Sequence, residues 1–113
     1  MTKILSRAAA GLFALGLSFA AAQAEDVQTV KLTLKDKAFT PAEITVPAGK
    51  AFVIEFTNEN ASPAELESAD LQIEKVAPAK STVTVKVKAL DKGQYAFVDE
   101  FQEDDAKGVI TAE

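Results

Sequence analysis

The sequence predicts a small all-β domain of antiparallel strands, arranged as a sandwich or a barrel. Segments at residues 30–35, 52–56 and 83–88 alternate apolar with polar side chains, and this period of two buries one face of a strand. Turn-forming residues separate such segments, as at residues 47–49 and 91–93. Strands and turns at this spacing, without a convincing helical stretch, are typical of an antiparallel sandwich or barrel.

Each predicted strand has its own set of apolar residues. In chain order these are Val30, Leu32 and Leu34; Ile44 and Val46; Phe52, Ile54 and Phe56; Val83, Val85 and Val87; Tyr95 and Phe97; and the segment 108–112. Residues 64–74 are interpreted as an excursion at one end of the domain, with room for a helical turn. The remaining segments supply the strands of one domain.

The N-terminus predicts a secretory signal peptide at residues 1–24. A basic start precedes an apolar stretch at residues 8–22, and residues 22–24 form a cleavage motif of the A-x-A type. A membrane anchor is the alternative, but about 15 apolar residues are fewer than the roughly 20 that a spanning helix needs. Cleavage before Glu25 leaves one domain at residues 25–113, without a membrane anchor and in the bacterial periplasm.

Composition excludes several classes of function. The chain has no Cys and no His, which excludes a disulfide, a thiolate nucleophile, a zinc finger and a Ser-His-Asp triad. With 17 acidic and 12 basic side chains, a nucleic-acid-binding surface is not expected. Signal cleavage also removes Lys3, Arg7 and the single Met1, which changes the net charge from −5 to −7. Any metal in the mature domain must therefore be held by oxygen or backbone groups.

Acidic side chains cluster in two segments of the predicted domain. The first contains Glu65 and Glu67, and the second contains Asp99, Glu100 and Glu103. Hard oxygen donors at this density suit iron, calcium, magnesium or manganese and do not suit copper(I). The simpler interpretation of the second segment is a solvated loop between two strands.

Side-chain alternation favours a cation site at Asp99. If Tyr95 and Phe97 point into the core, Asp99 lies on the same face of the strand. An inward carboxylate is costly unless it is hydrogen-bonded or bound to a cation. Phe101, within the acidic run, is expected to tuck onto the end of the sandwich, and anchoring a partner is its alternative role.

Several segments resemble the framework of cupredoxins. Residues 39–50 followed by residues 52–58 are similar to the opening of a cupredoxin. Residues 93–99, then a loop, then residues 108–111 resemble the segment that carries the Cys, His and Met ligands of copper proteins. The resemblance covers nearly the whole mature chain and implies a Greek-key antiparallel β-sandwich.

The copper-ligand positions of that framework are occupied by other residues here. Residues 63–67, Pro-Ala-Glu-Leu-Glu, stand where the first copper His would lie, and Asp99 stands where the Cys would lie. A blue-copper centre needs two His and a Cys thiolate, so electron transfer by such a site is excluded.

Within the cupredoxins, the chain resembles the EfeO-type cupredoxin-like domains and the small periplasmic cupredoxin-like proteins of bacterial Ftr-type iron-uptake systems. The likeness lies in residues 64–67, 74–76 and 93–101. It implies a role in iron uptake beside an iron permease and a second periplasmic metal-binding protein. It also implies iron, with copper or another hard divalent cation as alternatives, as the bound metal. The matching metal-site residues are Glu65, Glu67, Asp99, Glu100 and Glu103.

Two functions stay open at this point. The first is a periplasmic accessory protein that binds iron through carboxylates and supports a permease. Assistance to ferrous-iron oxidation is a variant of this function, although the chain shows no electron acceptor, so enzymatic activity is not established. The second is a metal-free cupredoxin-fold interaction module that has lost its site and kept its fold. Its acidic surface would then serve solubility or docking to a basic partner.

Overall fold

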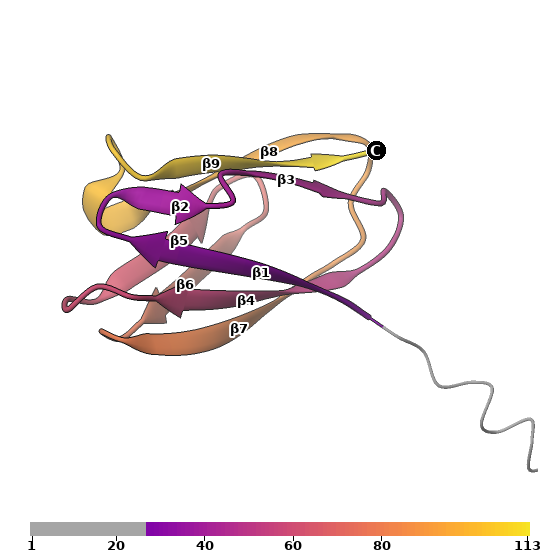
Figure 1. The fold of residues 1–113 in the computed structure, drawn as a ribbon. Coiled ribbons are helices and arrows are strands. Elements are labelled where there is room, and N and C mark those ends of the chain that lie inside the picture. The colour runs from indigo at the N-terminus through magenta and orange to yellow at the C-terminus, as the bar shows by residue number, and fades with distance from the viewer. Residues whose placement is uncertain (1–26) are drawn as a thin grey trace, which may run out of the picture.

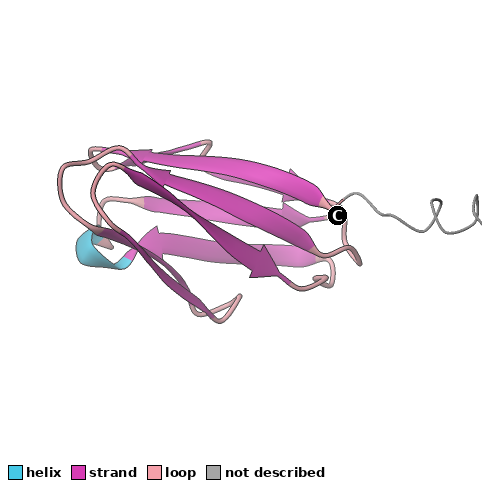
Figure 2. Ribbon diagram, turned by 90° about the horizontal axis from the view of Figure 1, so that it is seen from below, coloured by secondary structure: helices cyan, strands magenta, loops and turns pink. Residues whose placement is uncertain are grey.

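Two β-sheets packed face to face form the part of the chain that the structure describes (Figure 1, Figure 2). The structure is a computed structural model that describes residues 27–113. The predicted signal peptide and its cleavage site lie outside this part. Over residues 27–113, no helix combines the length and the apolar character needed to cross a membrane.

The first sheet has four strands in the order β2-β1-β4-β7. They are β1 (Gln28–Lys35), β2 (Ala38–Thr40), β4 (Phe52–Asn58) and β7 (Ser81–Val87). Every second residue of β4 is buried, from Phe52 through Ile54 and Phe56, as the alternation in the sequence predicts. This strand is central in its sheet and carries one wall of the core.

The second sheet has five strands in the order β3-β9-β8-β5-β6. They are β3 (Glu43–Val46), β5 (Ala64–Ser68), β6 (Ile73–Ala77), β8 (Gly93–Asp99) and β9 (Lys107–Ala112). A short 3₁₀ helix, η2 (Glu100–Gln102), follows β8 directly and lies at one end of the sandwich (Figure 2).

The predicted all-β sandwich is confirmed, but its sheets are mixed and not purely antiparallel. β1 pairs with β4 in parallel, and β3 pairs with β9 in parallel. The chain between β1 and β4 passes through β3 of the other sheet. Because this connection is a crossover and not a hairpin, β4 can run in the same direction as β1.

The interpretation of residues 64–74 as an excursion with room for a helical turn is wrong, because this segment contains β5 and the start of β6. The two strands form an antiparallel hairpin. Ala64, Leu66 and Ser68 face inward, and Leu66 is the one large apolar side chain among these three. Ser68 is buried because its hydroxyl donates a hydrogen bond to the carbonyl oxygen of Ala96, 2.6 Å away. Because a polar serine occupies this inward position, the alternation of apolar and polar residues that predicts a strand is not visible in the sequence.

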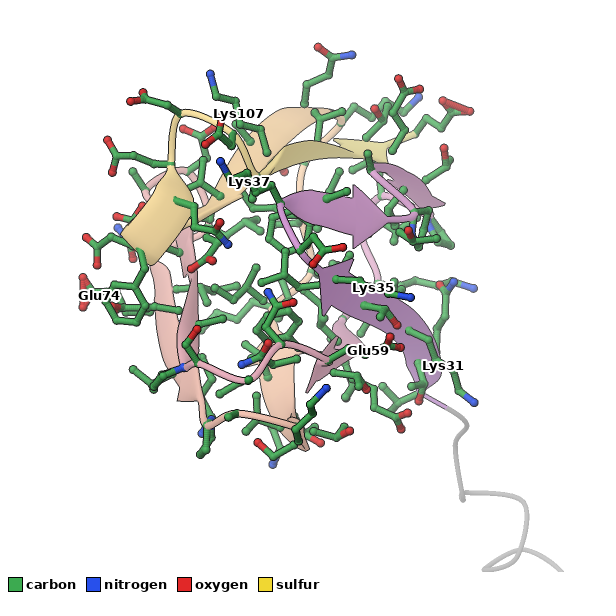
Figure 3. All side chains as sticks on the ribbon, turned by 60° about the vertical axis from the view of Figure 1, so that its left-hand side comes forward. Lys31, Lys35, Lys37, Glu59, Glu74 and Lys107 are labelled. Carbon is green, nitrogen blue, oxygen red and sulfur yellow. The ribbon has the colours of Figure 1, made fainter. Side chains whose placement is uncertain are left out.

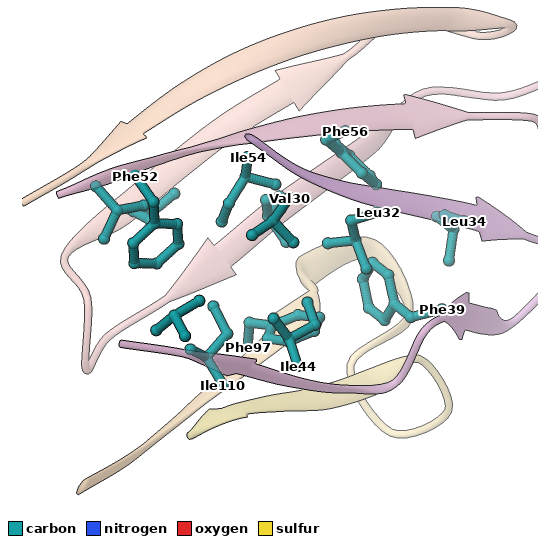
Figure 4. Close-up of a cluster of buried hydrophobic side chains, with 14 of the residues drawn as sticks. Val30, Leu32, Leu34, Phe39, Ile44, Phe52, Ile54, Phe56, Phe97 and Ile110 are labelled. Atoms are coloured by element: carbon teal, nitrogen blue, oxygen red, sulfur yellow. The ribbon is translucent and has the colours of Figure 1, made fainter. Parts of the chain in front are cut away.

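Aromatic side chains join the two sheets across the core (Figure 4). Phe39 of β2 packs edge-on against Phe97 of β8, with ring centroids 5.0 Å apart. Its ring also lies 6.1 Å from that of Phe56 in β4. Aromatic pairs at these separations are favourable beyond their buried area, so Phe39 links the first sheet to the second.

Gly108 in β9 lies under the ring of Phe97, its partner in β8. A Cβ atom at this position would be 2.7 Å from Cε1 of Phe97 and 2.8 Å from the carbonyl oxygen of Ala42. We expect Gly108→Ala to lower the free energy of unfolding by about 1–3 kcal/mol, because the ring must leave its packed position. Urea denaturation followed by circular dichroism measures this change. Lys107→Ala, at an exposed neighbouring position, should change it by less than about 0.5 kcal/mol; equal effects of the two substitutions would contradict the packing argument.

Candidate functional site

The two acidic segments of the sequence meet at one end of the sandwich. Strand pairing places Leu66 of β5 opposite Asp99 at the end of β8. Because η2 begins at the next residue, Glu100 lies close to β5. The pairing of β5 with β8 therefore brings together residues that are more than thirty positions apart in the chain.

Asp99 is only 1% exposed, so its predicted inward orientation is confirmed. Its Oδ1 accepts hydrogen bonds from the backbone N–H of Glu65 at 2.9 Å and of Phe101 at 3.2 Å. Its Oδ2 accepts a hydrogen bond from Nε2 of Gln102 at 2.9 Å. These hydrogen bonds account for the burial of the carboxylate without a cation. A role of Asp99 as a metal ligand stays a prediction.

Gln102 is a residue of this site that the sequence analysis missed. Besides Asp99, its side-chain amide donates a hydrogen bond to the carbonyl oxygen of Asp36, 3.2 Å away in the turn between β1 and β2. It thus ties η2 to the first sheet. The spacing Asp-x-x-Gln is typical of a capped helix start and is the sequence signal that could have identified the pair.

Glu65 and Glu67 alternate with the buried residues of β5 and lie on its outer face. Strand pairing places Glu65 opposite Val76 and Glu67 opposite Glu74 of β6. Side chains that are directly opposite on neighbouring strands contact each other, and like charges in this arrangement repel. Figure 3 shows Glu74 on one side of the molecule and Lys31 and Lys35 on the other. Glu74 is therefore not neutralised by these two lysines.

Repulsion and partial burial raise the pKa values of the two β5 glutamates. For Glu65, the largest cause is a side-chain hydrogen bond with Glu100, followed by burial and by nearby negative charges. For Glu67, burial raises the pKa most, followed by the negative charge of Glu100. Glu74 and Glu103 add to the repulsion at Glu67. We call Glu65, Glu67, Glu74, Glu100 and Glu103 the glutamate cluster.

The donor chemistry of the glutamate cluster fits a hard cation and does not fit a blue-copper centre. All of its side-chain donors are carboxylate oxygens, and the chain has neither Cys nor His. Over residues 27–113, no group of three acidic side chains is already arranged to hold a metal ion. Binding of a cation would therefore require the half-buried and exposed glutamates of the cluster to rotate toward a common point.

Phe101 does not tuck onto the end of the sandwich, which corrects the expectation from the sequence. Its side chain is 58% exposed. The hydrogen bond from its own backbone N–H to Asp99, together with the bonds of Gln102, fixes η2 in an orientation that directs the ring to solvent. The alternative role of Phe101, anchoring a partner, stays a prediction.

Residues 7–112 match the cupredoxin-like domain family. The chain belongs to this family. The cupredoxin framework that the sequence predicts is therefore confirmed, although the metal ligands of copper-binding members are missing from this cupredoxin-like chain.

Two curated relatives are similar to this cupredoxin-like chain. The iron uptake system component EfeO of Yersinia pestis is 33% identical over 88 residues, which are 76% of this chain and 23% of EfeO. An uncharacterized protein of Rickettsia prowazekii is 29% identical over 86 residues, which are 76% of this chain and 69% of that protein. The chain therefore spans less than a quarter of the length of EfeO.

Solved structures of copper-binding proteins share the fold. Auracyanin A, a blue copper protein of Chloroflexus aurantiacus, superposes with a TM-score of 0.67 at 18% identity, covering 78% of this chain and all of that one. The metal-binding domain of the Cu(I)-exporting ATPase CopA of Streptococcus pneumoniae has a TM-score of 0.69 at 17% identity, covering 80% of this chain and 89% of that one. At such identities the similarity shows the fold alone.

The hydrogen bonds of Asp99 make its removal costly. We expect Asp99→Ala to lower the free energy of unfolding by about 2–4 kcal/mol, because it leaves donors without an acceptor in a buried place. Asp99→Asn should cost less, since its carbonyl oxygen still accepts from the backbone while its amide cannot accept from Gln102. Urea denaturation gives both values. Asp104→Ala is the exposed control, and a stability of Asp99→Ala equal to that of this control would contradict the assignment.

The raised pKa of Glu65 predicts a pH-dependent effect of its substitution. A folded-state pKa above the ordinary 4.5 means that the native protein binds this proton more tightly than the unfolded chain. This group therefore favours folding less as pH rises through that window. We expect Glu65→Gln to raise the melting temperature at pH 7 in the presence of EDTA, and the gain to vanish below about pH 4.5. Glu43→Gln, in β3 at the opposite edge of the sheet, should give no such pH-dependent gain; the same gain there would point to net charge alone.

Proposed function

We propose that this protein is a periplasmic accessory of iron uptake that binds iron, or another hard cation, through carboxylates and supports a membrane permease. The observation that carries the proposal is the strand pairing that places Glu67 opposite Glu74, together with the position of η2, which brings Glu100 beside β5. The similarity to EfeO, an iron uptake system component, supports the choice of iron. The metal is cargo in this proposal.

The fold holds the glutamates close together in spite of their repulsion. Paired strands set the spacing of Glu65, Glu67 and Glu74, and η2 adds Glu100. Bringing like charges together raises the free energy of the ionised state. A cation bound between the carboxylates attracts each of them and offsets their mutual repulsion. The same charges that repel one another in the free protein therefore increase the affinity for a cation.

Oxygen donors also determine which oxidation state of iron is favoured. Ferric iron is the harder cation, so carboxylates stabilise it relative to ferrous iron. Such a site assists the loss of one electron from ferrous iron to an external acceptor such as dioxygen. The chain has no Cys or His for a copper centre. The proposed role is therefore to bind and deliver iron, and assistance to ferrous-iron oxidation is secondary.

The proposed location and partners rest on the N-terminal segment and on the EfeO similarity. Residues 1–24 have the basic start, apolar stretch and small-residue motif of a cleaved signal peptide. An iron permease in the membrane and a second periplasmic metal-binding protein are the partners that the similarity to EfeO suggests. The acidic domain would present its cargo to them.

A metal-free interaction module is the second candidate function. It is favoured by the hydrogen bonds of Asp99, which satisfy the one inward carboxylate of the predicted site without a cation. In this case the glutamates serve recognition alone, and the cupredoxin fold is kept as a scaffold.

Cation binding distinguishes the two candidates. We expect Mn²⁺, and Fe²⁺ under anaerobic conditions, to raise the melting temperature, because binding to the folded state alone stabilises it by about 2.7 kcal/mol at one hundred times the Kd. The double substitution Glu65→Gln with Glu67→Gln should abolish the increase. Differential scanning calorimetry and isothermal titration calorimetry give the two measurements.

The matched control for this experiment is Glu43→Gln with Glu55→Gln, which removes the same charge from other strands. It should keep the increase in melting temperature. No increase with any cation in the wild-type protein, together with no heat of binding, would leave the metal-free module as the function. Equal losses in both double variants would mean that only net charge matters.

A further inference from the structure

Two large apolar side chains lie exposed beside one cleft at the η2 end of the sandwich. Phe101 is 58% exposed and Val76 is 50% exposed. Both line a cleft of about 740 Å³, and Pro63 adds a third apolar side chain to its wall. Apolar side chains exposed to water do not contribute the stabilisation that their burial would give. A group of such side chains on a surface is therefore typical of an interaction site.

Phe101 is exposed on a backbone segment that hydrogen bonds hold in place. The backbone N–H of Phe101 is held by Asp99, a residue that is itself buried. The next residue, Gln102, donates hydrogen bonds to Asp99 and to the carbonyl oxygen of Asp36, which also lines the cleft. The aromatic ring is thus presented from an anchored backbone, which lowers the entropic cost of binding to it.

Acidic side chains border this apolar surface. Glu65 lies directly opposite Val76 on the neighbouring strand, and Glu100 precedes Phe101 in η2. The cleft's own basic residue, Lys37, is paired with Asp105 at 3.5 Å and so adds little positive charge. The surface therefore has an apolar centre and a negative rim, an arrangement that recognises a complementary protein surface.

We infer that this cleft is a docking site for a basic segment of a partner protein. One apolar side chain of the partner packs between Val76 and Phe101, while its flanking lysines or arginines meet Glu65 and Glu100. The inference rests on the proposed accessory role for its biological setting, but it needs no bound cation.

Charge selects this occupant over the others. A second copy of the chain, with a net charge of −7 after signal cleavage, would bring one negative rim against another. An anionic lipid surface is repelled for the same reason. A basic protein segment gains from both the apolar centre and the rim.

The test uses the exported protein, purified from the periplasmic fraction and kept in EDTA, so that its outcome does not depend on cation binding. The probe is a short peptide with one leucine flanked by lysines, titrated while backbone amide chemical shifts are recorded. We expect shifts at residues lining the cleft and saturable binding that weakens at 0.5 M salt. A peptide with glutamates in place of the lysines, and one with serine in place of the leucine, should each bind at least about tenfold more weakly.

Substitutions in the protein provide the matched controls. Phe101→Ala and Val76→Ala should each weaken binding about fivefold to tenfold while leaving Mn²⁺ binding unchanged. Val27→Ala removes an equally exposed valine away from the cleft, at the start of the described chain, and should leave peptide affinity unchanged. Equal affinities of the Val76→Ala and Val27→Ala variants, self-association in place of peptide binding, or equal binding of the acidic peptide would overturn the inference.

Discussion

The buried carboxylate of Asp99 is the interaction on which the functional end of this domain depends. It closes the end of β8 onto β5 through Glu65 and starts η2 through Phe101. Through Gln102 it also connects to the turn after β1. One side chain thus holds the glutamates of β5 close to Glu100 of η2. These hydrogen bonds give Asp99 a structural role at a position where the resemblance to copper proteins predicts a metal ligand.

The outer face of β5 and β6 concentrates negative charge that no ion pair within residues 27–113 neutralises. The hydrogen bond with Glu100 raises the pKa of Glu65 most and burial raises that of Glu67 most, and the neighbouring negative charges raise both further. In the two proposals, either a hard cation between the carboxylates or a basic protein segment across the rim would neutralise this charge. The two uses are compatible in an accessory protein, because arrival of a basic partner at the rim would compete with the cation and favour its release.

Sequence reasoning predicted the fold class and part of the site because both depend on local patterns. Alternation placed Phe52, Ile54 and Phe56 in the core and turned Asp99 inward, since successive side chains of a strand point to opposite faces. The β5–β6 hairpin escaped prediction because Ser68 is buried by a hydrogen bond and not by hydrophobicity. The exposure of Phe101 also escaped, because an aromatic residue in a loop is ordinarily covered.

Composition by itself determined that residues 25–113 have only oxygen and backbone groups with which to hold a metal, because they include neither Cys nor His. Tertiary structure decided which carboxylate oxygens are free to bind a ligand. Hydrogen bonds occupy those of Asp99, whereas the register of β5 with β6 turns Glu67 and Glu74 outward and against each other. Strand register and crossover connections bring together residues that are distant in the chain. Local sequence patterns therefore do not predict these contacts.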